Sequence, residues 1–392
     1  MPLTQPMAEP MNDPPPTDGL WSQFRRMMPC AERWAYFDHA AVAPLTMPAQ
    51  AALTNWAKEF AEHGAVNWPQ WAAELEHLRR RTAELLHADA DEIALIHNTT
   101  EGINLVAEGF PWQPGENVVM FDDEFPSNVY PWMNLASRGV EVRRVPGGDR
   151  PQLDRLADAC DDRTRIVTVS WIGFASGWRH DVDQLAELAH RRGALLFLDA
   201  IQGLGVFPLD VRQTAVDFLA ADGHKWLLGP EGAGLFYVRR QHLDRLRPLG
   251  LGWNSVVQAH DFSKIELRLK PTAGRYEGGT YNMPGLLALG ASLEMLDDYP
   301  PEAISQRLLE LTDAICERLP TLGAAVASCR EREHASAIVS FDLPGRNLAE
   351  IRRHCRERNV VLSARGGRLR VSPHAYNNDD DIERLMEALG SA

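Results

Sequence analysis

The chain has 392 residues, with 40 Lys and Arg against 54 Asp and Glu, and so carries a formal net charge of −14. This acidic balance argues against nucleic-acid binding, because non-specific contact with phosphates requires a cationic face. Hydrophobic residues make up 45% of the chain, which is typical of a globular protein. No apolar run approaches the ~18 residues of a membrane-spanning helix, and the first residues lack a signal-peptide pattern, so we expect a cytoplasmic protein without a membrane partner.

The N-terminal part of the chain divides into a tail and a bridging segment. Residues 1–19 are rich in proline and contain little that could form a core, so we expect a disordered tail. Residues 20–65 are expected to bridge to a smaller C-terminal domain.

Residues 66–285 are predicted to form a large domain. Apolar residues at three- and four-residue steps predict an amphipathic helix over 72–86, and a second helix is expected to end at Gly193. Short apolar runs of the kind found in buried strands lie at 118–121, 140–145, 166–170, 195–198 and 235–238. Continuous apolar strands that alternate with helices indicate an α/β fold with a mostly parallel sheet between helices.

Residues 286–392 are predicted to form a smaller α+β domain. A long helical stretch over 286–319 opens this region. It is followed by strands at 336–343, 359–363 and 368–372 and by helices at 347–357 and 379–389.

The stretch 195–238 carries the most chemical information. Asp199 follows an apolar strand, at the edge of the sheet where open α/β folds bind ligands. Gln202 comes three residues later, and Lys225 lies in a Gly-His-Lys-Trp segment that glycines follow. This combination fits a pyridoxal-phosphate site, in which a lysine forms a Schiff base and a carboxylate keeps the pyridine nitrogen protonated.

Five other segments extend this pattern along the chain. They are Tyr-Phe-Asp-His-Ala-Ala at 36–41, Asn-Thr-Thr-Glu-Gly-Ile-Asn at 98–104, Glu-Phe-Pro-Ser-Asn-Val-Tyr-Pro-Trp at 124–132, Arg-Tyr-Glu-Gly-Gly-Thr-Tyr-Asn at 275–282 and Arg-Val-Ser-Pro-His-Ala-Tyr-Asn at 370–377. With 199–232 they resemble, in order, the motifs of the class V aminotransferases. This family of fold-type I pyridoxal-phosphate enzymes includes cysteine desulfurases, selenocysteine lyases and isopenicillin N epimerase-like proteins. The resemblance implies their seven-stranded type of sheet and pyridoxal 5′-phosphate as cofactor.

The resemblance also implies roles for single residues around the cofactor. Lys225 would be the Schiff-base lysine and would move the α-proton of the substrate. Asp199 would pair with the pyridine nitrogen, Gln202 would hydrogen-bond the phenolic oxygen, and Phe125 would stack on the ring. The phosphate would be bound by Thr99, Thr100 and His224, and by Thr280 of a neighbouring subunit, which implies a homodimer with shared sites.

On the substrate side, Arg370 matches the arginine that binds the α-carboxylate of an amino acid, a task suited to the guanidinium fork. Arg365 is expected to be a second carboxylate contact. His39 stands where the family usually has Asn, and we expect it near the substrate. Trp171 is expected in the substrate pocket. Aromatic residues of Trp-rich segments, here also Trp178 and Trp253, belong to a hydrophobic core about as often as they contact a ligand.

Three departures from the family pattern bear on function. Many desulfurases have a histidine at Phe125, and the family's usual serine is replaced by Asp222, which we expect to point away from the phosphate toward an arginine or a main-chain N–H. Desulfurases also use a cysteine on a loop shortly before the carboxylate-binding arginine. Residues 359–370 contain none, and Cys355, the nearest, falls inside a predicted helix.

The five cysteines are scattered without a Cys-x-x-Cys pair, so we expect reduced thiols and neither disulfides nor a metal site. The sequence therefore predicts a lyase of the β-elimination, C–S type that needs no protein persulfide. An aminotransferase or an amino-acid epimerase is the alternative, because all three would use Lys225, Asp199 and Arg370. A cysteine desulfurase and a non-enzymatic homologue are disfavoured.

Overall fold

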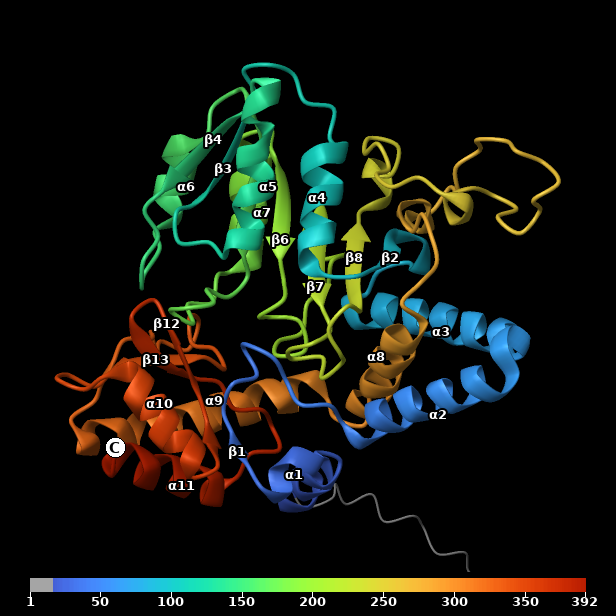
Figure 1. Ribbon diagram of the computed structural model, residues 1–392. Coiled ribbons are helices and arrows are strands. Elements are labelled where there is room, and N and C mark those ends of the chain that lie inside the picture. Colours follow the sequence, from blue (N-terminus) through green and yellow to red (C-terminus); the bar gives the residue numbers. More distant parts are fainter. Residues whose placement is uncertain (1–16) are drawn as a thin grey trace, which may run out of the picture.

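A seven-stranded sheet forms the centre of the large domain in the computed structural model, which describes residues 17–392 (Figure 1). The strands lie in the order β2-β8-β7-β6-β5-β3-β4. Strands β7, β6, β5, β3 and β4 are parallel, and β8 runs antiparallel to both of its neighbours. The bounds are β2 (Ile93–Ile96), β3 (Asn117–Phe121), β4 (Glu141–Val145), β5 (Thr164–Ser170), β6 (Leu195–Asp199), β7 (Phe218–Asp222) and β8 (Gly234–Val238).

Helices cover both faces of this sheet, as the sequence predicts for an α/β fold. Alternate residues of each strand enter two different hydrophobic clusters, so that Phe197 and Phe218 lie in one cluster and Leu198 and Leu219 in the other. The helices of the large domain are α2 (Met47–His63), α3 (Trp68–Leu86), α4 (Thr99–Gly109), α5 (Tyr130–Met133), α6 (Leu153–Ala159), α7 (Val182–Arg191) and α8 (Met283–Leu296). The predicted fold class is therefore confirmed.

The smaller domain is an antiparallel sheet, in the order β12-β13-β10-β9, packed against helices (Figure 1). Strand β1 (Ala35–Tyr36), from the N-terminal segment, pairs in parallel with β11 of this domain. The remaining elements are α9 (Pro301–Arg318), β9 (Ala325–Val326), β10 (Val339–Asp342), α10 (Leu348–Glu357), β11 (Val360–Val361), β12 (Ser363–Arg365), β13 (Arg368–Val371) and α11 (Asp379–Gly390).

Two boundaries differ from the sequence-based expectation. Residues 1–16 of the predicted tail lie outside the described residues, but helix α1 (Thr17–Arg26) starts inside the range expected to be disordered. The helical stretch expected over 286–319 is two helices, α8 and α9, because Pro300 and Pro301 cannot continue a helix. Helix α8 packs against α2 and α3, so the large domain extends beyond residue 285. Among residues 17–392, no helix is both long and apolar enough to span a membrane.

A buried ion pair fixes the segment that precedes α8. The Arg79 Nη1 and Nη2 atoms of α3 lie 2.5 and 3.0 Å from the two carboxylate oxygens of Glu277. The same carboxylate accepts hydrogen bonds from the Leu95 backbone N–H and the Tyr281 hydroxyl, both at 2.6 Å. The side chains of Arg79 and Glu277 are 9% and 1% exposed. This cluster ties residues 275–282 to α3 and β2.

Replacing Arg79 by alanine should destabilise the protein strongly, because Glu277 would remain buried without its cation. Loss of one partner of a buried pair costs about 3–5 kcal/mol. The urea midpoint of unfolding measures the effect. Arg212→Ala is the control, because the Arg212–Asp89 pair is largely exposed and contributes at most about 1 kcal/mol. Equal shifts of the two midpoints would contradict the assignment.

Candidate active site

Three strand ends place polar side chains at one edge of the sheet. Asp199 ends β6, and its register partner Ser170 ends the neighbouring strand β5. Asp222 ends β7 on the other side of β6, and Lys225 follows it three residues later. Because the strands are parallel, these groups meet at the carboxyl edge, where open α/β sheets bind ligands.

The turn that carries Lys225 is held by its own backbone. The Gly223 N–H donates to the Ala233 carbonyl at 2.8 Å, and the Gly229 N–H donates to the Gly223 carbonyl at 2.9 Å. Leu228 adopts a φ of +58°, a left-handed conformation that non-glycine residues rarely occupy outside functional sites. The turn therefore fixes the lysine side chain, which is buried.

Burial controls the charges of Lys225 and Asp199. Burial lowers the pKa of Lys225 to about 8, with the Asp199 carboxylate opposing this shift and the Arg370 cation adding to it. Burial also raises the pKa of Asp199 to about 6, against a hydrogen bond from the Ile201 backbone N–H and the charge of Lys225. A lysine with such a pKa has a substantial unprotonated fraction near neutral pH and can act as a nucleophile or a base.

The N-terminus of α4 has the features of a phosphate site. Asn98 caps the helix, and its side-chain oxygen accepts from the Glu101 N–H at 2.9 Å. Within residues 17–392, the buried Thr99 hydroxyl has no hydrogen-bond partner. Thr100 is exposed, and its hydroxyl lies 2.9 Å from that of Ser127. An unpaired buried donor beside the free N–H groups of a helix N-terminus fits the phosphate of the predicted cofactor.

Gln202 lies against the turn of Lys225. Its side-chain oxygen accepts from the Trp226 indole N–H at 2.8 Å, and its nitrogen donates to the Ala40 carbonyl at 2.9 Å. The amide nitrogen carries a second hydrogen. A bond from Gln202 to the phenolic oxygen of the cofactor stays a prediction.

Phe125 lies beside the lysine, as expected for a ring that covers the cofactor. Its ring centroid is 5.7 Å from the Lys225 amine, and its side chain is 40% exposed. Phe174 packs edge-on against it at a centroid distance of 5.2 Å. The two rings form an apolar surface beside the lysine, and neither ring can donate or accept a proton.

Glu124 has no predicted role, although its segment matches a family motif. The buried Glu124 carboxylate accepts from the Ser170 backbone N–H at 2.8 Å and from the Asn128 side chain at 3.0 Å. Burial raises its pKa to about 7, with the Asp199 charge contributing. Glu124 therefore joins the Phe125 segment to β5 and lies near Asp199. An acid directly before the stacking aromatic was the available signal.

The structure fixes Arg370 on three sides. Its Nε donates to the Ser363 hydroxyl at 3.2 Å, Nη1 to the Phe174 carbonyl at 2.6 Å and Nη2 to Asp38 at 3.2 Å. N–H groups on Nη1 and Nη2 remain for a substrate carboxylate. Arg365 is half-buried and near enough to lower the pKa values of both Lys225 and Arg370.

A position of His39 near the substrate stays a prediction, and the structure shows which groups hold its ring. This side chain is fully buried, with Nδ1 at 2.9 Å from the Ser372 carbonyl and Nε2 at 2.9 Å from the Tyr376 hydroxyl. Burial lowers its pKa well below the usual value. With both ring nitrogens engaged, His39 joins the N-terminal segment to the small domain and has no nitrogen to offer a substrate.

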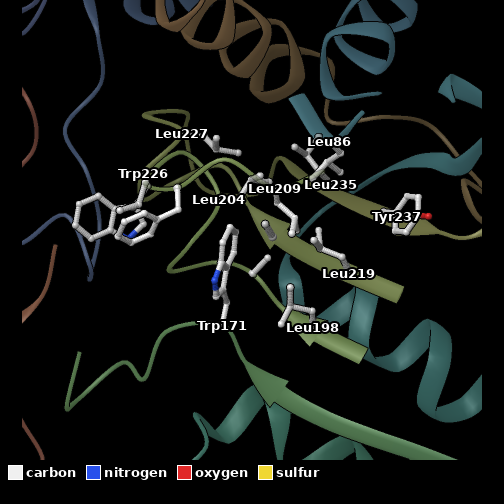
Figure 2. Close-up of a cluster of buried hydrophobic side chains, with 14 of the residues drawn as sticks. Leu86, Trp171, Leu198, Leu204, Leu209, Leu219, Trp226, Leu227, Leu235 and Tyr237 are labelled. Carbon is white, nitrogen blue, oxygen red and sulfur yellow. The ribbon is translucent and has the colours of Figure 1, made fainter. Parts of the chain in front are cut away.

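Trp171 is buried in a hydrophobic cluster, and its expected contact with the substrate stays a prediction. Figure 2 shows its ring among the buried side chains of the cluster that contains Leu198 and Leu204. A side chain at Gly203 would collide with the ring at 2.2 Å, so only glycine allows this approach. Trp178 is buried too and stacks on His334 at a centroid distance of 3.8 Å.

Three further residues named in the sequence analysis are Thr280, Cys355 and Asp222. Thr280 is exposed, in the segment that Glu277 holds in place. Cys355 lies in α10, is fully buried in the small-domain core, and burial raises the pKa of its thiol to about 11. Asp222 is expected to point toward an arginine or a main-chain N–H; among residues 17–392 its Oδ1 atom has no hydrogen-bond partner, and its Oδ2 lies 3.0 Å from Nδ1 of His224.

Comparison with known proteins identifies related sequences over nearly the whole chain. The family model "Aminotransferase class-V" matches residues 35–385. A "Probable cysteine desulfurase" of Methanothermobacter thermautotrophicus is 31% identical and covers 93% of this chain and 96% of its own. The "Cysteine desulfurase CsdA" of Escherichia coli is 30% identical and covers 95% of this chain and 97% of its own.

Solved structures show the same fold. A structure of Escherichia coli CsdA superposes with a TM-score of 0.84 at 26% identity and covers 95% of this chain and 98% of its own. A complex of the cystine C–S lyase C-DES with its product cysteine persulfide gives a TM-score of 0.87 at 22% identity, covering 93% and 99%. At that identity the second likeness concerns the fold alone.

The pKa of Lys225 predicts how the apoprotein takes up pyridoxal 5′-phosphate. Covalent attachment requires the unprotonated amine, so the rate should rise about tenfold from pH 6 to pH 7 and level off above pH 8. Stopped-flow absorbance of the visible band measures this rate. A rate that still rises steeply between pH 9 and 10, as for an ordinary lysine, would contradict the assigned pKa. The other lysines, Lys58, Lys264 and Lys270, are the peptide-mapping controls after borohydride reduction.

Proposed function

The chain belongs to the class V aminotransferase family of pyridoxal 5′-phosphate enzymes, and from this premise we propose a lyase that cleaves a carbon–sulfur bond of an α-amino acid. The reaction is a β-elimination that breaks the Cα–H and Cβ–S bonds. It releases the sulfur as a sulfide, thiol or persulfide and, after hydrolysis, yields pyruvate and ammonia.

The observation that carries this proposal is the position of Cys355. Desulfuration through a protein persulfide needs a reactive thiolate that reaches the substrate. Loop residues 359–370 have no cysteine, and Cys355 lies in the core of the small domain with its pKa raised to about 11. A buried, protonated thiol within a helix is a poor acceptor of sulfur. The chain is therefore proposed to release sulfur directly to solution.

Each residue at the carboxyl edge of the sheet has its own proposed role in the reaction. The bound cofactor would supply an electron sink for the carbanion at the substrate α-carbon. Lys225, fixed by its turn, removes the α-proton near neutral pH. Asp199 offers its carboxylate to the pyridine nitrogen, and the Thr99 hydroxyl and α4 N-terminus offer hydrogen bonds to the phosphate. Phe125 and Phe174 give this centre an apolar side.

Arg370 is proposed to orient the substrate through its carboxylate. Its side chain is 1% exposed and held by Ser363 and Asp38, so the fork is positioned before substrate arrives. Arg365 supplies a second positive charge nearby. The two cations favour an anionic group beside Lys225 within a chain that is acidic overall.

A homodimer with shared sites is part of the proposal. Thr280 is exposed, although family members place this threonine against the phosphate of the neighbouring subunit. Its segment follows 262–267, whose apolar side chains Phe262, Ile265 and Leu267 are 70%, 95% and 74% exposed. Large exposed apolar side chains in the stretch of chain before Thr280 are what a second copy would cover.

A panel of sulfur-containing amino acids tests the reaction class. The loaded enzyme should release sulfide, thiol or persulfide with equal amounts of pyruvate and ammonia. Cys355→Ala should keep this activity within about twofold, and Lys225→Ala should lose it together with the visible band of the bound cofactor. Lys58→Ala, on the exposed face of α2, is the matched lysine control.

Other results of the panel would refute the lyase. Sulfur release that disappears in Cys355→Ala would establish a desulfurase. Accumulation of the pyridoxamine form without pyruvate would establish an aminotransferase, and inverted chirality in recovered substrate would establish an epimerase. A protein that takes up no pyridoxal 5′-phosphate would refute the enzyme altogether.

Arg370→Ala should raise KM for the amino acid about 10- to 100-fold, since a charged hydrogen bond contributes about 1.5–3 kcal/mol. The kcat/KM for the corresponding decarboxylated amine should change far less. Arg368→Ala is the control, because this arginine of the same strand pairs with Asp149 and Asp342. Equal losses for both substrates would place the carboxylate elsewhere.

A further inference from the structure

Asp222 and His224 form a close pair at the edge that carries Lys225. Oδ2 of Asp222 lies 3.0 Å from Nδ1 of His224, and the two side chains are 5% and 16% exposed. Nδ1 itself is buried. The accessible part of the imidazole is therefore on the side of the ring turned away from Asp222.

The pair is next to the proposed phosphate site. A Cβ built on Gly234 would lie 3.3 Å from the Cα of Asp222 and 3.5 Å from the Cα of Asn98, the residue that caps α4. The Asp222 charge also acts on Lys225, whose pKa it raises. The backbone of Asp222 thus lies near the helix N-terminus, and its carboxylate is near enough to Lys225 to act on its charge. A carboxylate in this region would repel an anionic phosphate.

The pairing of Asp222 is incomplete within residues 17–392. Its Oδ1 atom is buried without a hydrogen-bond partner, and the contact between Oδ2 and Nδ1 is a charge contact that is not aligned as a hydrogen bond. A buried carboxylate with an unpaired oxygen lowers the stability of the folded state unless another group compensates its charge. The ring of His224 is the polar group that contacts this carboxylate.

We propose that Asp222 is a positioning residue that orients the ring of His224, with Nδ1 toward Asp222 and Nε2 toward the cofactor phosphate. Nε2 then faces the phosphate as a hydrogen-bond donor, while the contact at Nδ1 keeps the ring in this orientation. A hydrogen bond to an anionic phosphate is stronger than one to a neutral acceptor. Asp222 thereby serves the phosphate indirectly, although its own charge opposes it. The inference rests on the cofactor site proposed above.

A double-mutant cycle on cofactor binding tests the pair. Affinities of the full-length apoprotein for pyridoxal 5′-phosphate and for pyridoxal, which lacks the phosphate, are measured by quenching of tryptophan fluorescence. Asp222→Asn should weaken pyridoxal 5′-phosphate about tenfold, or about 1.4 kcal/mol, and change pyridoxal less than twofold. In a His224→Asn background the same substitution should change neither affinity more than twofold.

Three results would overturn the proposal: unchanged or tighter binding of pyridoxal 5′-phosphate by Asp222→Asn, equal loss for pyridoxal, or equal loss in both backgrounds. Asp222→Ser is the second variant if Asp222→Asn does not fold, as judged by its urea midpoint. Thr99→Val serves as the comparator, because it removes a proposed phosphate contact that does not involve His224. Since no turnover is measured, failure of the lyase assay and failure of this cycle are separate outcomes.

Discussion

A lysine amine and an aspartate carboxylate share a water-poor edge of the sheet, and this constraint governs the rest of the site. Burial makes the charged form of each group costly, so the pKa values of Lys225 and Asp199 move to about 8 and about 6. The turn at Leu228 and the apolar pair of Phe125 and Phe174 keep this environment in place. A larger fraction of the Lys225 amine is thereby unprotonated at neutral pH than for an ordinary, solvent-exposed lysine.

The departures from the family pattern change which groups around Lys225 and Asp199 can carry a proton or a charge. Phe125 stands where many desulfurases have a histidine, and its ring cannot carry a proton. The loop before Arg370 lacks the cysteine that could accept sulfur. Asp222 adds a negative charge where the family usually has a hydroxyl. In the proposed reaction, proton transfer at the substrate would be left to Lys225. The added carboxylate of Asp222 lies against the ring of His224.

The local pattern of the chain was sufficient to predict the core strands of the sheet and the residues that surround the lysine. Asp199 and Lys225 were found because a strand end and a glycine-rich turn are visible in the order of residues. Strands β2 and β7 and the antiparallel direction of β8 were not predicted, because pairing depends on partners distant in sequence. The burial of His39 and Trp171 could not be predicted for the same reason: their surroundings come from Ser372, Tyr376 and Gly203, which no local pattern reveals.

The contacts of Arg370 connect substrate recognition to the arrangement of the domains. This arginine belongs to the small domain, yet Nη1 bonds to the Phe174 carbonyl of the large domain and Nη2 to Asp38 of the N-terminal segment. A rotation of the small domain would break the bond to Phe174 and release a donor. If the proposed substrate carboxylate took this donor, it would compete with the bond that joins the two domains, and substrate binding and domain orientation would be thermodynamically linked.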